Sequence, residues 1–322
     1  MKTIARIAMA IAAVALVATD GTAQSWPSRL VTIVVPYPPG GANDVVARQF
    51  AERLTAALGQ SFIIDNRAGA GGIVGSASVA KSAPDGYALL VGNNGTHVIQ
   101  PLVSATARYD PQKDFTAIAK LVDAYQFLGV NADLPVRNVA DLIALAKREP
   151  GKLNYGSAGS GSFGNFAGEM LRLYAGIDIV HIPYRGSGQA VADLAAGRVQ
   201  FMLDPAVLSQ AKGGRVRVIA TTGPHRFEGL PDVPTMKETG LPEFELVGWF
   251  GLFGPAGLPR DIATRLASAV ATIAADPDMQ KRMLAAGVVM SATTPEAFEA
   301  ILKRDLQRYG EIKKRANIQA VE

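Results

Sequence analysis

Short β-branched runs alternate with amphipathic stretches along most of the chain. Residues 30–35 form an apolar, strand-like run that ends in a proline- and glycine-rich turn at 36–41. After Asp44 an apolar residue recurs every four positions: Val46, Phe50, Leu54 and Leu58. This spacing predicts an amphipathic helix with Asn43 as its N-cap. The first unit is therefore a strand, a glycine turn and a helix.

The same order of elements repeats further along the chain. Strands are predicted at 62–65, 87–91, 153–155, 179–183, 199–203, 216–221 and 247–254. Helices are predicted at 73–82, 138–148, 163–174, 188–196, 260–274, 278–285 and 295–315. Because strands that alternate with helices form parallel sheets, the pattern predicts an α/β fold.

Two domains are expected in this chain. Residues 116–130 are predicted as two strand segments broken at Asp123–Ala124, where the chain crosses from one domain to the other. Residues 24–123 and 227–322 are assigned to a first, discontinuous domain, and residues 124–226 to a second. Two connections between domains make a natural hinge.

The N-terminus has the layout of a secretory signal. Lys2 and Arg6 precede an apolar run at 7–18, and small residues follow up to Ala23. Twelve apolar residues are too few to span a bilayer, which takes roughly twenty. We therefore expect residues 1–23 to be a cleaved signal peptide and the mature protein to be periplasmic. The chain has no cysteine, which excludes a lipid-modified cysteine anchor.

Composition excludes several kinds of function. Hydrophobic residues make up 48% of the chain and charged residues 19%, as in a packed globular protein. The net charge is only +4, and no basic stripe interleaved with aromatics predicts a nucleic-acid partner. Without cysteine there are no thiol nucleophiles, zinc-thiolate sites or disulfides, and the three histidines lack metal-ligand spacing. No metal or cofactor is predicted.

Two glycine turns stand between a strand and a helix, at 38–44 and 156–162. The first N–H groups of a helix have no intrahelical acceptor, and the helix dipole is positive there, so such a turn attracts an anion. Ser157, Ser160 and Ser162 add hydroxyl donors. With one turn in each domain, the two could clamp a carboxylate without an arginine. The alternative is that both are ordinary tight turns with capping residues.

Enzyme alternatives have weaker support. Gly159, Gly161 and Gly164 spell the dinucleotide fingerprint G-x-G-x-x-G, but the next strand ends in Tyr184-Arg185 without the acidic residue that binds ribose. The chain has no G-x-S-x-G elbow and no phosphate-loop motif. The sequence therefore predicts a binding protein and not an enzyme.

Three side chains have both a structural and a binding interpretation. Asp204 follows a predicted strand and either caps the next helix or faces a ligand, because open α/β sheets bind ligands at the carboxyl ends of their strands. Tyr37 and Trp249 either line a cleft or pack in the core. Asp44 is expected to stabilise the helix that it begins.

Seven segments, in one order over nearly the whole chain, resemble the Bug-type solute receptors of the tripartite tricarboxylate transporter class. They are VPYPPGGANDVVAR from Val35, IIDNRAGAGG from Ile63, PDGYALL from Pro84, GKLNYGSAGSGS from Gly151, HIPYRGSGQAVADLAAGRVQFMLD from His181, LPDVPTM from Leu230 and WFGLFGPAGLP from Trp249.

The resemblance implies a type II periplasmic binding protein fold, in which two doubly wound α/β domains close on a small carboxylate ligand. It implies a monomer that delivers this ligand to the membrane subunits of a tripartite tricarboxylate-type transporter. The ligand-binding residues it implies are Tyr37, Gly41, Ala42, Asn43, Asn93, Thr96, Ser157, Ser160, Gly161, Ser162 and Asp204.

Three residues depart from the family pattern. Gln100 and Pro205 each stand where asparagine is usual, and Asn165 replaces a common histidine. These changes leave the clamp intact but leave the ligand open among dicarboxylates, aromatic acids, amino acids and nicotinate-like compounds. An exported ligand sensor and a secreted hydrolase are the alternative functions.

Overall fold

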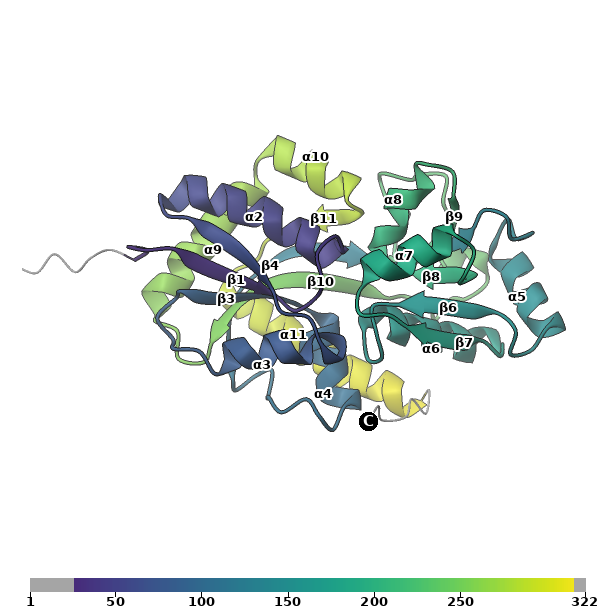
Figure 1. Ribbon diagram of the computed structural model, residues 1–322, viewed down its shortest axis with the longest axis horizontal. Coiled ribbons are helices and arrows are strands. Elements are labelled where there is room, and N and C mark those ends of the chain that lie inside the picture. The colour runs from purple at the N-terminus through teal and green to yellow at the C-terminus, as the bar shows by residue number, and fades with distance from the viewer. Residues whose placement is uncertain (1–25, 316–322) are drawn as a thin grey trace, which may run out of the picture.

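The computed structural model describes residues 26–315, which form two domains, each built on its own β-sheet (Figure 1). The six-stranded sheet has the order β11-β4-β10-β3-β1-β2, and the five-stranded sheet has the order β7-β6-β8-β5-β9. We call these the six-stranded and the five-stranded domain. The predicted signal peptide lies outside the described residues. None of the helices in residues 26–315 is long and apolar enough to cross a membrane.

The six-stranded domain is built from both ends of the described chain. Its strands are β1 (Val31–Val35), β2 (Phe62–Asn66), β3 (Ala88–Asn93), β4 (Phe115–Tyr125), β10 (Val247–Pro255) and β11 (Val288–Met290). Helices α2 (Ala42–Leu58), α9 (Arg260–Ala274) and α10 (Pro277–Ala285) cover one face (Figure 1). Helices α3 (Ile73–Ala80), α4 (Gln100–Val103) and α11 (Pro295–Arg315) cover the other.

The five-stranded domain contains the middle of the chain. Its strands are β5 (Phe127–Asn131), β6 (Asn154–Ser157), β7 (Val180–Pro183), β8 (Phe201–Leu203) and β9 (Val216–Thr221). Its helices are α5 (Val139–Arg148), α6 (Phe163–Ala175), α7 (Ser187–Ala195) and α8 (Leu208–Ala211). Apolar residues of α6 and α7 are buried in separate core clusters, so the sheet is covered on both faces.

The sheets correct four details of the sequence-based prediction. Both sheets are mixed, because β10 runs antiparallel to β3 and β4, and β5 runs antiparallel to β8 and β9. Strand β4 continues through the predicted break at Asp123–Ala124 and ends at Tyr125, because it pairs with β10 over its whole length. The π-helical turn at Gly95–Ile99 with α4, and the short strand β11, were not predicted.

Three chain segments are hydrogen-bonded side by side where the domains join. Gln126 is the single residue between β4 and β5, and its backbone N–H donates to Thr222 Oγ1 at 3.0 Å. The Thr222 N–H donates to Gln126 O at 2.9 Å, and the Leu246 N–H donates to Thr222 O at 2.9 Å. The connections between the domains are therefore short and paired with each other.

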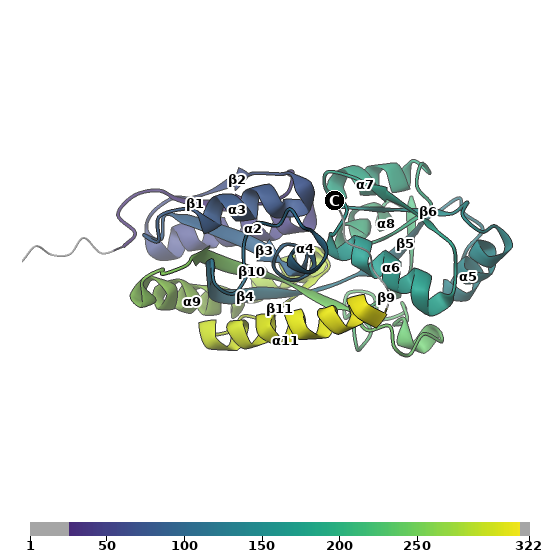
Figure 2. The same ribbon diagram turned by 90° about the horizontal axis from the view of Figure 1, so that it is seen from below.

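Helix α11 is attached to the central strand β10 by a buried polar network. Asp305, 2% exposed, accepts hydrogen bonds from Trp249 Nε1 at 2.8 Å and from Asn94 Nδ2 at 3.2 Å. Figure 2 shows α11 running along the six-stranded domain toward the five-stranded one, and Tyr309 packs edge-on against Phe163 with ring centroids 5.9 Å apart. The helix thus supports the wall where the two domains meet.

We expect Asp305→Ala to destabilise the protein, because two buried donors would lose their acceptor. Leaving buried donors unpaired costs about 2 to 4 kcal/mol in total. Urea unfolding would measure the change. The control is Glu299→Ala on the exposed side of the same helix, which should stay within about 0.5 kcal/mol of the wild type. Equal stability of the two variants would contradict a stabilising role for this network.

Candidate functional site

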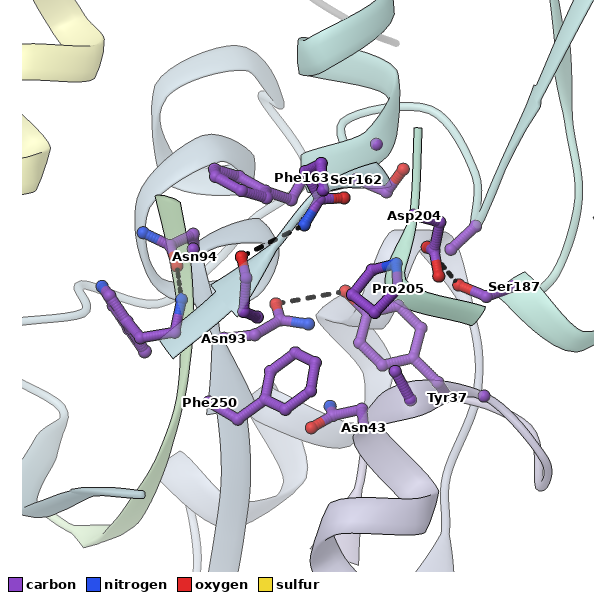
Figure 3. A pocket seen from close by; sticks show the side chains of 18 residues that line it. Tyr37, Asn43, Asn93, Asn94, Ser162, Phe163, Ser187, Asp204, Pro205 and Phe250 are labelled. Carbon is purple, nitrogen blue, oxygen red and sulfur yellow. Dashed lines mark hydrogen bonds between the residues drawn. The ribbon is translucent and has the colours of Figure 1, made fainter. Parts of the chain in front are cut away.

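One cavity lies between the two domains, at the carboxyl ends of β1, β3 and β8. Its volume is about 50 Å³, and we call it the cleft cavity. The residues that line it are Tyr37, Gly41, Ala42, Asn43, Asn93, Asn94, Ala124, Gln126, Ala158, Ser162, Phe163, Gly164, Ser187, Asp204, Pro205, Gly248, Trp249 and Phe250 (Figure 3). Both domains and the strands that join them contribute to this lining.

Helix α2 presents its N-terminus to the cleft cavity. Gly41, in an extended conformation, is the N-cap, so the predicted cap at Asn43 is wrong by two residues. The reason is that Asp44 turns back and accepts a hydrogen bond from the Gly40 N–H at 3.0 Å. Within the described residues, no hydrogen bond uses the backbone N–H groups of Ala42 and Asn43. These donors are free for an anion in the cavity.

Asp44 itself does not compete for that position. Arg48 Nε donates to it at 2.9 Å and Asn66 Nδ2 at 2.9 Å. Burial raises the pKa of Asp44, but the hydrogen bonds from Arg48, Gly40 and Asn66 outweigh burial and leave the pKa below its ordinary value. The carboxylate is therefore ionised and paired, which is the structural role that the sequence predicted.

Helix α6 presents the matching N-terminus from the five-stranded domain. Ser162 is its N-cap, and its Oγ accepts from the Asn165 N–H at 3.2 Å. The N–H groups of Phe163 and Gly164 take part in no hydrogen bond within residues 26–315. Two helix N-termini from different domains therefore point free donors at one cavity.

The side chain of Asp204 is on the cavity wall between these helices. It caps the short helix after β8 by accepting from the Ala206 N–H at 2.8 Å, and Ser187 Oγ donates to its other oxygen at 2.6 Å (Figure 3). Burial raises the pKa of Asp204, and the hydrogen bonds from Ser187 and Ala206 act in the opposite direction. Asp204 thus caps the short helix and also lines the cleft cavity.

Tyr37 and Asn93 form the floor of the cavity in the six-stranded domain. The Tyr37 hydroxyl donates to Gly71 O at 3.3 Å and to Asn93 Oδ1 at 3.4 Å. Burial raises the pKa of Tyr37 to about 12, so the phenol is neutral at physiological pH. Asn93 Oδ1 also accepts from the Thr96 N–H at 3.0 Å.

The structure brings seven of the eleven predicted site residues to the cleft cavity. They are Tyr37, Gly41, Ala42, Asn43, Asn93, Ser162 and Asp204. Thr96 is fully buried behind Asn93, and the Gly161 N–H already donates to Asn165 Oδ1 at 3.0 Å. Ser157 and Ser160 also point elsewhere. The four residues outside the lining support the loops that carry the other seven.

Ser157 and His181 form a pair that bears on the hydrolase alternative. Ser157 Oγ lies 2.7 Å from His181 Nε2, which is the spacing of a nucleophile and its base. However, Ser157 has no exposed surface, and its hydroxyl also bonds the Gly159 N–H at 3.1 Å. Burial lowers the pKa of His181 to about 4. The pair stabilises the glycine loop and has no contact with the cleft cavity.

Ser160 lies on a second, larger cavity, of about 600 Å³, behind the glycine loops. There the side chain of Gln100 reaches from the six-stranded domain, and its Nε2 donates to Ser160 O at 2.8 Å. Gln100 is 2% exposed. This residue departs from the family pattern, and its longer side chain makes a direct bond between the domains.

Sequence reasoning missed other residues that line the cleft cavity. They are Asn94, Ala124, Gln126, Ala158, Phe163, Gly164, Ser187, Gly248 and Phe250. Phe163 and Gly164 could have been predicted, because they are the first residues after the N-cap of α6. Ser187 could also have been predicted, because it begins α7 after a third glycine turn. Phe250 could not be found in this way, because its place depends on the pairing of β10 with β3 and β4.

The cavity contains no basic side chain. None of its lining residues is lysine, arginine or histidine, so only backbone N–H groups, helix dipoles and neutral side chains could attract an anion there. In the part of the chain that the structure describes, no cluster of three or more histidine, cysteine or acidic side chains could hold a metal ion. The arrangement is suited to holding an anion and shows no catalytic constellation.

These features define a solute-binding protein of the periplasmic type. The chain belongs to the family described as tripartite tricarboxylate transporter family receptor, whose pattern matches residues 46–318. It is 33% identical over 300 residues to Protein BugT of Bordetella pertussis, covering 92% of each chain. It is 36% identical over 308 residues to a protein from the tcbD-tcbE intergenic region of Pseudomonas sp. strain P51, covering 93% of this chain and 91% of that one.

Solved structures support the same assignment. Rpa4515 of R. palustris with adipate superposes with a TM-score of 0.90 at 36% identity, covering 92% of this chain and 100% of that one. The periplasmic binding protein BugD gives 0.88 at 32% identity, with coverage of 92% and 100%. MatC of Rhodopseudomonas palustris with bound malate gives 0.85 at 31% identity, with coverage of 89% and 99%. The type II periplasmic binding fold expected from the sequence is confirmed.

Gly161→Ala should destabilise the protein through two effects. Gly161 has φ +71, a conformation that costs other residues about 1 to 2 kcal/mol. Its new methyl group would also meet Gln100 Nε2 at 2.6 Å. Adding Gln100→Ala removes that clash, so in urea unfolding the double variant should lose about 0.5 to 2 kcal/mol less than the sum of the single variants.

The matched control is Gly176→Ala at the other end of α6. Gly176 also has a positive φ, of 59°, but a methyl group there would meet no atom within 4 Å. Its effect should add to that of Gln100→Ala within about 0.5 kcal/mol. Additivity at Gly161 as well would show that Gln100 is not packed against the glycine loop.

Proposed function

We propose that this protein is exported to the periplasm, captures a small carboxylate-containing ligand in the cleft cavity, and delivers it to a tripartite tricarboxylate-type membrane transporter. The observation that carries the proposal is the pair of helix N-termini, α2 and α6, with free N–H groups at one cavity. Family membership and the relatives with adipate and malate support it. Release of the unchanged ligand, without catalysis, completes the cycle.

In this proposal the ligand carboxylate bridges the domains. Ala42 and Asn43 donate from the six-stranded domain, and Phe163 and Gly164 donate from the five-stranded domain. Hydrogen bonds to a charged acceptor are stronger than neutral ones. A ligand that takes both sets of donors therefore favours the closed arrangement over any open one. The side chains of Asn93 and Ser162 are placed to add polar contacts.

The hinge in this proposal is the paired connection at Gln126 and Thr222. Residues 24–123 with 227–322, and residues 124–226, would move as the two rigid bodies. The single residue between β4 and β5 supports the first boundary of this division. After Thr222 the chain still packs on the five-stranded domain, because Thr221 pairs with Thr235 and Phe227 packs against Phe127, which favours a second boundary close to Leu246. We propose that the first boundary lies two or three residues beyond position 123.

A carboxylate panel in a thermal-shift assay tests the function. Dicarboxylates, aromatic acids and amino acids are compared with neutral sugars and peptides. A ligand at a hundred times its dissociation constant adds about 2.7 kcal/mol to the free energy of unfolding. At least one carboxylate should raise the melting temperature, and neutral sugars should not. A shift by sugars or peptides alone would contradict the proposal.

Small-angle X-ray scattering tests domain closure. The mature protein should show a smaller radius of gyration with the best ligand of the panel than without it, because the free N–H groups of both domains then share one anion. A compound from the panel that causes no thermal shift serves as the control. Identical profiles with and without saturating ligand would show that the domains do not close on it.

A further inference from the structure

The two domains touch through glycine loops that leave no room for side chains. A Cβ on Gly71 would lie 2.8 Å from Ser160 O, and a Cβ on Gly159 would lie 3.8 Å from Gly71 Cα. Gly71 has φ +62 and Gly161 has φ +71, so other residues would be strained at these positions. Because the loops belong to different domains, this contact is lost if the domains move apart.

One side chain crosses this contact. Gln100, the first residue of α4, extends from the six-stranded domain, and its Nε2 donates to Ser160 O at 2.8 Å. The amide lies between glycines of both domains, because a Cβ on Gly71 or on Gly161 would clash with Gln100 Nε2. Gln100 is 2% exposed, so the bond lies away from water, where a hydrogen bond is stronger.

The Gln100 bond joins the domains away from their connections. Within the described residues, no other hydrogen bond or salt bridge joins residues 127–221 to residues 26–125 or 247–315. The other polar links between the domains use Gln126 or residues 222–246, which belong to the connections themselves. Gln100 lines the second cavity and not the cleft cavity, so its bond acts on the arrangement of the domains without contact to a ligand in the cleft.

We propose that Gln100 is a positioning residue that latches the two domains in the closed arrangement and so sets the balance between closed and open molecules. This inference rests on the domain closure in the proposed function. When the domains part, water replaces the partners of the Gln100 amide and of Ser160 O, so the bond stabilises the closed arrangement alone. One such bond changes an equilibrium constant about three- to tenfold.

Spin labels on α2 and α7 report the arrangement of the mature protein without added ligand. Both helices begin at the cleft cavity, where the Cβ position of Gly41 lies 3.8 Å from Ser187 Cβ. Because the chain has no cysteine, Glu52→Cys on α2 and Ala192→Cys on α7, both exposed, place one label in each domain. Pulsed electron paramagnetic resonance then measures the label separation in closed and open molecules.

Three substitutions separate the hydrogen bond from packing. Gln100→Ala removes the amide, Gln100→Asn holds it one methylene group farther from Ser160 O, and Gln100→Glu keeps the shape but places an acceptor against that oxygen. After circular dichroism shows a folded protein, each should lower the ratio of closed to open molecules by about threefold or more. If the wild type is mainly open without ligand, the same loss appears in calorimetry as about threefold weaker binding of adipate, malate or the best other carboxylate of the panel.

The matched control is Ser104→Ala at the end of α4, because the Ser104 hydroxyl group bonds only within its own domain, to Thr106. It should leave the label separation and the affinity unchanged.

The outcomes separate the latch from the proposed function. Gln100 variants that change neither the label separation nor the affinity would overturn the latch. A wild type that shows no closed molecules, with or without a carboxylate, would do the same. An effect of Gln100→Ala that Gln100→Glu does not share would show packing in place of a hydrogen-bonded latch. If no carboxylate binds, the proposed function is wrong, and the label separation still decides the latch.

Discussion

The arrangement of the site depends on backbone N–H groups that the fold leaves without acceptors. The first turn of every helix has such groups, and most helices satisfy them with side-chain caps or water. Here the N-cap of α2 is a glycine, which has no side chain to accept a hydrogen bond. In α6 the hydroxyl group of the N-cap Ser162 accepts from the Asn165 N–H, so the N–H groups of Phe163 and Gly164 have no acceptor within the described residues. Because the two helices belong to different domains, the donors of both meet only when the domains face each other across the cleft.

This constraint explains why so much of the surrounding structure is polar and buried. Asp44, Ser157, Thr96 and Asn165 all bond backbone groups of the loops that precede helices or follow strands. His97, although buried, is neutral, because burial lowers its pKa to about 3, and it stacks on Phe253 with ring centroids 4.0 Å apart. These side chains hold the loops in position and do not occupy the free N–H groups of the two helix N-termini.

The local pattern of the sequence was sufficient to predict most elements, but not how they pair. In α2 the apolar residues recur every four positions because one face of the helix is buried, and β1 is a β-branched run because the whole strand is buried. Both patterns are visible in consecutive residues of the sequence. The antiparallel entry of β10 between β3 and β4 joins residues more than 120 positions apart, and no local signal encodes it. The three-residue strand β11 is too short for any periodicity to show.

For the site, too, the sequence predicted the local features but not the contacts between distant residues. The glycine turns located both helix N-termini, yet of the four residues predicted in the second turn only Ser162 lines the cavity, while Ser157, Ser160 and Gly161 face the loop or the other domain. Positive φ angles at Gly159 and Gly161 turn the chain between them, and side-chain direction after such turns cannot be read from spacing.

In the proposed function, recognition of the carboxylate and selection among carboxylates would use different parts of this cavity. Backbone N–H groups are present whatever side chains the loops carry, so the anion clamp tolerates substitution at the positions around it. The other contacts come from side chains such as Asp204, Pro205 and Phe250, which lie on elements from both domains. Pro205 has no N–H and no polar side chain, so the polar groups on that wall are the carboxyl group of Asp204 and the hydroxyl group of Ser187.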